Sequence, residues 1–262
     1  MPAIVVAVAV LGLFFLGYKY YSAYLARKVY GLDPAFVTPA HEFRDGVDFV
    51  PTNKHVLFGH HFTSVAGAAP IVGPAIAVFW GWGPALAWVV LGTIFAAGVH
   101  DFGSLVVSVR HKARSIGTLA GDVINRRARF LFLVIIFFLL TLVNAVFAVV
   151  IGNLFVANPG AVIPIFVEIP FAIAIGQYIY RTRSSALVPS LLGVAMLYFL
   201  IWVGQQLPVD ITPLATELGF EQPRNLWVII LFVYTFFASR LPVWMLLQPR
   251  DYINSHQLFI AL

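Results

Sequence analysis

The chain contains no cysteine, and only 10% of its 262 residues are charged. The lack of cysteine excludes disulfides and thiolate metal sites. The scarcity of charge excludes a soluble globule of this size, because too little polar surface is available to cover it. The sequence also lacks a Walker motif, a nucleophile elbow and a dinucleotide fingerprint, which leaves ATP-driven pumping and hydrolysis without a basis. We therefore expect no enzyme activity, no cofactor and no metal site.

Apolar residues dominate instead, at 61% of the chain with a mean hydropathy of +0.91. About 20 apolar residues are needed to cross roughly 30 Å of hydrocarbon. The composition therefore predicts an all-α polytopic membrane protein with about seven transmembrane helices, forming a single transmembrane domain over residues 1–262. The first run has no basic leader and no cleavage signal, so we expect it to be retained as an extra N-terminal span. The seven runs are 3–24, 56–78, 84–109, 130–153, 162–180, 186–205 and 226–247.

The net charge of +5 is distributed as a membrane protein distributes it, and does not indicate nucleic-acid binding. Basic residues gather in alternate connections, which would share one side of the bilayer. By the positive-inside rule that side is cytoplasmic. The sequence thus predicts a chain of the inner (plasma) membrane with its N-terminus outside and its C-terminus inside. The basic residues are Arg27 and Lys28, six residues between 110 and 129, Arg181, Arg183 and Arg250.

The connection between the third and fourth runs leaves two interpretations open. Residues 115–124 place apolar side chains at helical spacing, which indicates a short helix at the membrane interface. The alternative is a solvated basic loop that holds lipid phosphates.

The second run is interrupted by helix breakers. Residues 59–74 contain three glycines and two prolines, which is typical of the discontinuous helices that face a transporter cavity. We expect the break between Ser64 and Gly73. Adjacent residues on a helix point in different directions, so only one of the two neighbouring histidines is expected to face the cavity. The alternative for that histidine is a hydrogen bond to a carbonyl at a helix end. The candidate substrate-binding residues of this segment are His60, His61, Ser64, Gly67 and Gly73.

Two carboxylates lie inside apolar runs, where an unpaired charge costs several kcal/mol. Asp101 lies about nine residues before Arg110, so it is either an ion- or proton-coupling group or a residue anchored at the inner interface. Glu168 lies nearer the middle of its run, beside Pro170. It is either a cation or proton site or the partner of a polar side chain on a neighbouring helix.

Arg240 is the basic residue that lies deepest in a predicted span, next to a second break at residues 239–242. A guanidinium stays charged at physiological pH and requires an anion. That anion is either Asp101 or Glu168 in a structural ion pair, or the carboxylate of a substrate, which a guanidinium binds through two parallel bonds.

Five separated motifs, in order along the chain, together resemble the carbon starvation protein A (CstA) family. The resemblance implies an inner-membrane protein of the starvation response that takes up a peptide or pyruvate by secondary, proton- or cation-coupled transport. The fold expected from the resemblance and from the order of the spans is the first repeat of a LeuT-type transporter plus an extra N-terminal helix. Residues 55–262 would be the transporter core, with the broken helices as its first and sixth core helices. The motifs are 51–62, 66–74, 98–102, 114–117 and 247–252.

Chains of that family are longer, so the resemblance implies an N-terminal portion. We expect a transporter that acts on a small nutrient together with a proton or cation in the lipid bilayer. Such a chain would work as a homo-oligomer or with a missing C-terminal half. The alternative is a truncated or split membrane subunit or scaffold that does not transport.

Overall fold

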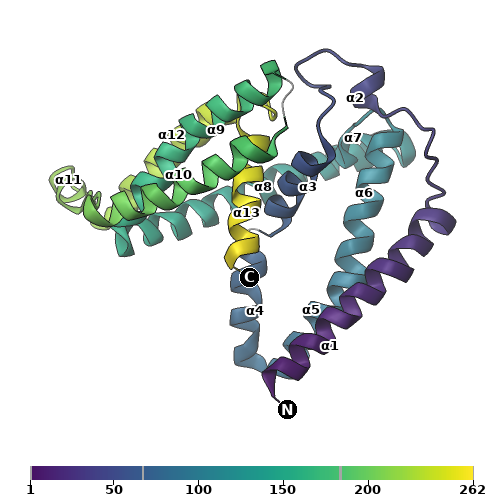
Figure 1. Ribbon diagram of the computed structural model, residues 1–262, viewed down its shortest axis with the longest axis horizontal. Helices are drawn as coiled ribbons and strands as arrows, with labels where there is room; N and C mark the ends of the chain where they lie inside the picture. Colours follow the sequence, from purple (N-terminus) through teal and green to yellow (C-terminus); the bar gives the residue numbers. More distant parts are fainter. Residues whose placement is uncertain (1, 67, 183–184, 262) are drawn as a thin grey trace. The chain divides into compact units, whose positions relative to one another are not determined.

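A computed structural model describes residues 2–66, 68–182 and 185–261, in which every regular element is a helix (Figure 1). The predicted all-α class is confirmed for these residues. Five helices are long and apolar enough to cross a membrane, and they coincide with five of the seven predicted runs, as expected for a multi-pass membrane protein. They are Ala3–Val29, Trp82–Arg110, Arg126–Ala157, Pro159–Thr182 and Leu187–Gln206.

The other two predicted runs are interrupted, as their glycines and prolines indicated. The first contains α3 (Lys54–Val65) and α4 (Ala68–Ala77), and Ala66, directly after α3, lies outside both helices. The second, 226–247, contains α12 (Pro223–Ala238), stops being helical at residues 239–246, and ends where α13 (Leu247–Ala261) begins.

The chain divides into two compact units, of which the first comprises Met1–Arg44 and Ala66–Val134. In this unit α1 (Ala3–Leu16) continues through two π-helical turns to Val29 and packs against the span Trp82–Arg110.

Aromatic contacts hold these two spans of the first unit together. Tyr21 lies 5.1 Å from Phe95 and Tyr30 lies 5.0 Å from Phe102, measured between ring centroids. Tyr30 also donates a hydrogen bond to the carbonyl of Val99 at 3.2 Å. These contacts join the span before the first loop to the span that carries Asp101.

The basic connection in this unit is a helix, α7 (Ile116–Val123), which confirms the first of the two interpretations of its secondary structure. Ser115 caps it by accepting a hydrogen bond from the backbone N–H of Thr118. Arg114 forms an ion pair with Asp122 at 3.0 Å across the helix.

The second unit comprises Asp45–Val65 and Ile135–Leu262. Besides α3, α12 and α13, it contains most of α8 (Arg126–Ala157), α9 (Val162–Thr182), α10 (Leu187–Gln206) and the short α11 (Thr212–Glu217). Helices α9 and α10 lie side by side (Figure 1). One core cluster, Phe155, Val162 and Trp227, joins α8, α9 and α12, and a second, Ala172, Val194, Leu246 and Ile253, joins α9 and α10 to α13 and its preceding turn.

The loop that leads into α3 is ordered around Asp45. Its carboxylate accepts backbone N–H bonds from Phe49 and Val47 at 2.8 Å and from Asp48 at 2.9 Å. Gly46, at a φ of 81°, supplies the left-handed conformation of this turn. The bonds stabilise the ionised carboxylate, with Phe49 contributing most, and so lower the pKa of Asp45. Their contribution is therefore complete at neutral pH and is lost only as the pH falls through that lowered pKa.

The tightest helix contact in the second unit lies where α10 meets the turn before α9. A Cβ atom built on Gly204 would lie 2.1 Å from the carbonyl oxygen of Gly160. Both segments are backbone, so neither can move aside as a flexible side chain would.

We expect Gly204→Ala to destabilise the protein by about 1–3 kcal/mol through overpacking. The matched control is Gly12→Ala in α1, where a Cβ meets no atom within 4 Å and helix propensity favours alanine. Thermal unfolding in detergent measures both. A melting temperature for Gly204→Ala equal to that of the control would contradict the close approach.

Candidate functional site

The candidate site is built around α13, a polar helix that packs against α3, α9 and α10. The turn before it is fixed by Leu246 and the helix by Ile253, each only 1% exposed. The anchored helix brings charged and polar side chains inside a unit whose other helices are mostly apolar. Polar groups placed there require partners. The polar side chains of α13 at this point are Arg250, Asp251, Asn254, Ser255 and His256.

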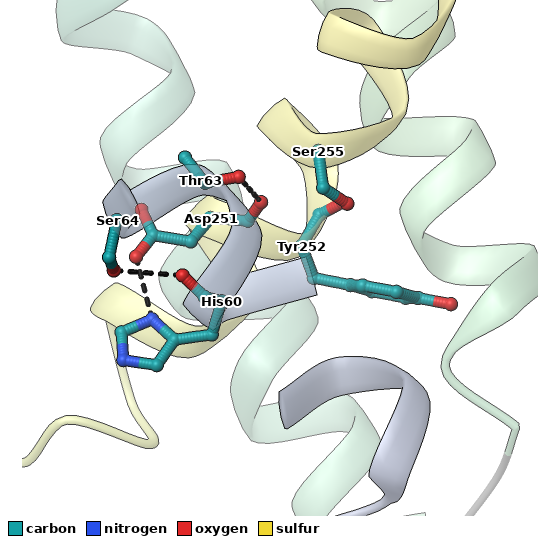
Figure 2. A network of polar contacts seen from close by, with 6 residues as sticks. All are labelled: His60, Thr63, Ser64, Asp251, Tyr252 and Ser255. Atoms are coloured by element: carbon teal, nitrogen blue, oxygen red, sulfur yellow. Dashed lines mark hydrogen bonds and ion pairs between the residues drawn. The ribbon is translucent and has the colours of Figure 1, made fainter. Parts of the chain in front are cut away.

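The first contact joins α13 to α3. His60 Nδ1 lies 2.6 Å from Asp251 Oδ2, and the two side chains are 27% and 16% exposed (Figure 2). Thr63 Oγ1 donates to the backbone carbonyl of Asp251 at 2.8 Å, and Ser64 Oγ donates to that of His60 at the same distance. These contacts thus join α3, which precedes the first interruption, to α13, which follows the second.

This contact requires a glycine one residue before His60. A Cβ atom on Gly59 would lie 2.6 Å from Tyr252 Cδ2 and 2.8 Å from Ser255 Oγ. The missing side chain therefore allows α3 to approach α13 closely enough for the histidine to reach Asp251.

The second contact joins α13 to α9 through Glu168, which is 6% exposed. Its carboxylate is close enough to the charged groups of Arg250 and Asp251 on α13 to interact with them electrostatically. One carboxylate oxygen, Oε1, is buried without a hydrogen-bond partner in the described chain. Pro170, inside α9, has no N–H to bond the carbonyl of residue 166, which adds a free acceptor on the same helix.

A third contact joins α13 to α10. Ser190 is fully buried, and its Oγ lies 3.0 Å from His256 Nε2. The His256 ring packs edge-on against Tyr252 at 4.7 Å between centroids. Three neighbouring helices therefore each offer one polar group to α13.

Of the sequence-predicted residues, His60 contacts Asp251 of α13, and Glu168 lies within electrostatic range of the same residue. His61 and Ser64 lie on the same helix as His60 but are exposed. Gly73 is exposed on α4, in the first unit, where a Cβ would meet open space. Gly67 lies outside the described residues.

Asp101 is also in the first unit, on α6 (Gly98–Arg110). Its carboxylate lies 3.0 Å from His100 Nδ1, and its side chain is 40% exposed. The structure does not place it among the residues around α13.

Arg240 lies in the turn after α12 and is exposed. Its guanidinium stands over the Phe236 ring, 5.8 Å from the centroid. It lines a cavity of about 320 Å³ together with Asp48, Trp244 and Gln248. Among the described residues of its own unit, it forms no ion pair with Glu168 or with Asp48.

Sequence reasoning missed Arg250, Asp251 and Asn254. The signal was present in the motif at residues 247–252, but Arg250 was taken as a cytoplasmic charge that follows the last span. The structure continues the chain as a helix through these residues and packs it inside the unit.

Two arginines of the second unit, Arg240 and Arg250, form no ion pair with the described residues of that unit. In the part of the chain that the structure describes, no group of three or more histidine, aspartate or glutamate side chains could hold a metal ion. A guanidinium without an ion-pair partner can hold an anion.

Comparison with known proteins gives one consistent family. A family profile described as carbon starvation protein CstA matches residues 2–262. The peptide transporter CstA of Campylobacter jejuni is 37% identical over 97% of this chain and 36% of its own length. The peptide transporter CstA of Bacillus subtilis is 34% identical over 100% of the chain and 44% of its own length. The pyruvate/proton symporter BtsT of Escherichia coli is 33% identical over 97% of the chain and 35% of its own length. No solved structure matches.

The contact between His60 and Asp251 predicts a measurable coupling. In a double-mutant cycle with His60→Ala and Asp251→Ala, we expect an interaction free energy of about 0.5–3 kcal/mol, because each single change leaves the other polar group half-buried without its partner. Thermal unfolding in detergent measures it. His61→Ala, exposed on the same helix, is the control and should change stability by less than about 0.5 kcal/mol. Additive effects of the two substitutions would show that the pair does not interact.

Proposed function

The chain belongs to the carbon starvation protein CstA family, and on that premise we propose that it acts in secondary transport across the cell inner membrane. It would move a small nutrient, a peptide or a pyruvate-like carboxylate, inward with a proton or cation. The observation that carries this proposal is the polar helix α13, which is enclosed by α3, α9 and α10 and joins His60, Asp251 and Glu168.

The two interrupted segments support a transporter. A break exposes backbone carbonyls and the dipole ends of half-helices, which can hold an ion or a charged substrate inside a membrane. Helices α3 and α13 adjoin the two breaks, and they are held together by the contact between His60 and Asp251. The LeuT-type arrangement has broken helices in corresponding places, and this likeness is an analogy of fold.

We assign the coupling role to Glu168. A carboxylate that is buried with an unsatisfied oxygen can take up a proton or a cation at low structural cost. It interacts with Asp251, which in turn contacts His60. A proton or cation bound at Glu168 would therefore alter the charge balance at the junction of α3 and α13, beside both breaks.

The names of the relatives point to two different substrate classes, so an experiment must decide between them. Two of the relatives above are named peptide transporters and one a pyruvate/proton symporter. The chain spans between 35% and 44% of the length of these relatives. The test must therefore use the chain as it is, beside a full-length relative.

Purified chain in proteoliposomes should take up radiolabelled pyruvate or a labelled dipeptide severalfold faster with an inward proton gradient than without one. The gradient supplies the driving force if a proton moves with the substrate. Empty liposomes give the background, and liposomes with a full-length relative give the positive control. No uptake by this chain beside an active relative would contradict transport by the chain alone.

Glu168→Gln should remove the dependence of uptake on the proton gradient, because an amide cannot carry a proton between the two sides. Glu217→Gln, in the exposed helix α11, is the matched control and should leave that dependence unchanged. The measurement is initial uptake rate against imposed pH difference. Gradient dependence equal to wild type in Glu168→Gln would exclude Glu168 as the carrier.

A further inference from the structure

A second cavity in the same unit has a different chemistry from that at Arg240. It has a volume of about 280 Å³ and lies between α8, α9, α12 and α13. Its wall is mostly aliphatic and aromatic, with Phe155 and Phe166 among its rings. The polar groups in the wall are Arg250, Asn144, Tyr234 and Thr235, and no acidic residue is among the lining residues.

Arg250 is the one charged group of this cavity. Its Nε is buried without a hydrogen-bond partner, and its guanidinium forms no ion pair in the described chain. Glu168 interacts with it electrostatically but is not within ion-pair distance. A fixed positive charge that faces an apolar cavity among membrane helices requires an anion. None of the described residues supplies one in contact with Arg250.

We propose that this cavity binds a small monocarboxylate through Arg250. The carboxylate would accept two parallel hydrogen bonds from the guanidinium. The hydroxyls of Tyr234 and Thr235 can donate to its remaining oxygens, and the alkyl group lies against the Phe166 side of the wall. A volume of about 280 Å³ is close to the lower end of ligand pockets, which suits a molecule of a few heavy atoms. This inference rests on the proposed transport function.

The same cavity disfavours a zwitterion. The ammonium group of an amino acid or dipeptide would lose its water without meeting a carboxylate in the wall, which is costly. The exposed cavity at Arg240 differs in this respect because Asp48 lines it. The charge pattern of the Arg250 cavity therefore selects monocarboxylates over peptides.

Glu168 and the bound anion would share the single positive charge of Arg250. Two negative groups near one cation repel each other, and that repulsion is strong where water is scarce. Removing the charge of Glu168 should therefore strengthen binding of the monocarboxylate, whereas removing the charge of Arg250 should weaken it. A merely structural role of either residue would not produce opposite changes.

The experiment is equilibrium binding of radiolabelled pyruvate to the purified full chain in nanodiscs, with unlabelled competitors. Arg250→Gln should weaken binding by at least about tenfold, because hydrogen bonds to a charged group are lost. Arg250→Lys should bind between wild type and Arg250→Gln, because the charge stays but the planar fork is lost. Glu168→Gln should bind more tightly than wild type. Arg181→Gln, exposed at the end of α9, is the matched control and should bind as wild type does.

Competition identifies the class of ligand. Lactate and propionate should displace pyruvate, whereas the neutral amide pyruvamide and the dipeptide dialanine should not. The proposal is overturned if wild type does not bind pyruvate, if dialanine competes as well as lactate, or if Arg250→Lys and a folded Arg250→Gln both bind as wild type does. It is also overturned if Arg240→Gln, and not Arg250→Gln, removes binding.

Failure of this site and failure of the transport function give different results. Gradient-driven uptake without pyruvate binding at Arg250 would reject the site and keep the function. Pyruvate binding that depends on Arg250, in a chain without uptake, would keep the site and reject transport by this chain alone.

Discussion

The second unit depends on one constraint, which is that a polar helix enclosed by apolar helices must find partners for its side chains. Helix α13 meets that constraint on three sides. Asp251 contacts His60 of α3, Arg250 lies within electrostatic range of Glu168 of α9, and His256 contacts Ser190 of α10. The position of each neighbouring helix is thus tied to a polar group of α13 as well as to its apolar packing.

Close backbone approach makes these contacts possible. A Cβ on Gly176 of α9 would lie 2.5 Å from Pro249, and a Cβ on Gly193 of α10 would lie 2.8 Å from Ile253. With Gly59 on α3, each of the three helices around α13 has a glycine at the contact. Glycine lowers the stability of an isolated helix. Here that loss is offset by close helix packing and by polar contacts that form only when the helices are close together.

The polar groups around α13 differ from those of an ordinary protein core because some of them lack hydrogen-bond partners. Glu168 Oε1 and Arg250 Nε both lack hydrogen-bond partners in the described chain, although they lie in neighbouring elements. A buried group left in this way is a cost that a purely structural network would avoid. In a transporter, the same cost is removed when a proton, an ion or a substrate anion occupies the site, which gives binding a free-energy gain that differs between conformations.

The sequence by itself determined the all-helical membrane class, the five continuous spans and the two interruptions, because hydropathy and helix breakers act locally along the chain. It also determined that Glu168 is unusual, since a carboxylate in an apolar run needs a partner. It did not determine that α13 turns back into the unit, so Arg250 was read as a cytoplasmic charge and Asp251 was not recognised as the partner of His60. Asp251 and His60 are 191 positions apart in the sequence. Contacts between residues so far apart in the chain depend on how the helices pack. Only the tertiary structure decided which of the two adjacent histidines contacts Asp251, and that Arg250 and Arg240 line different cavities.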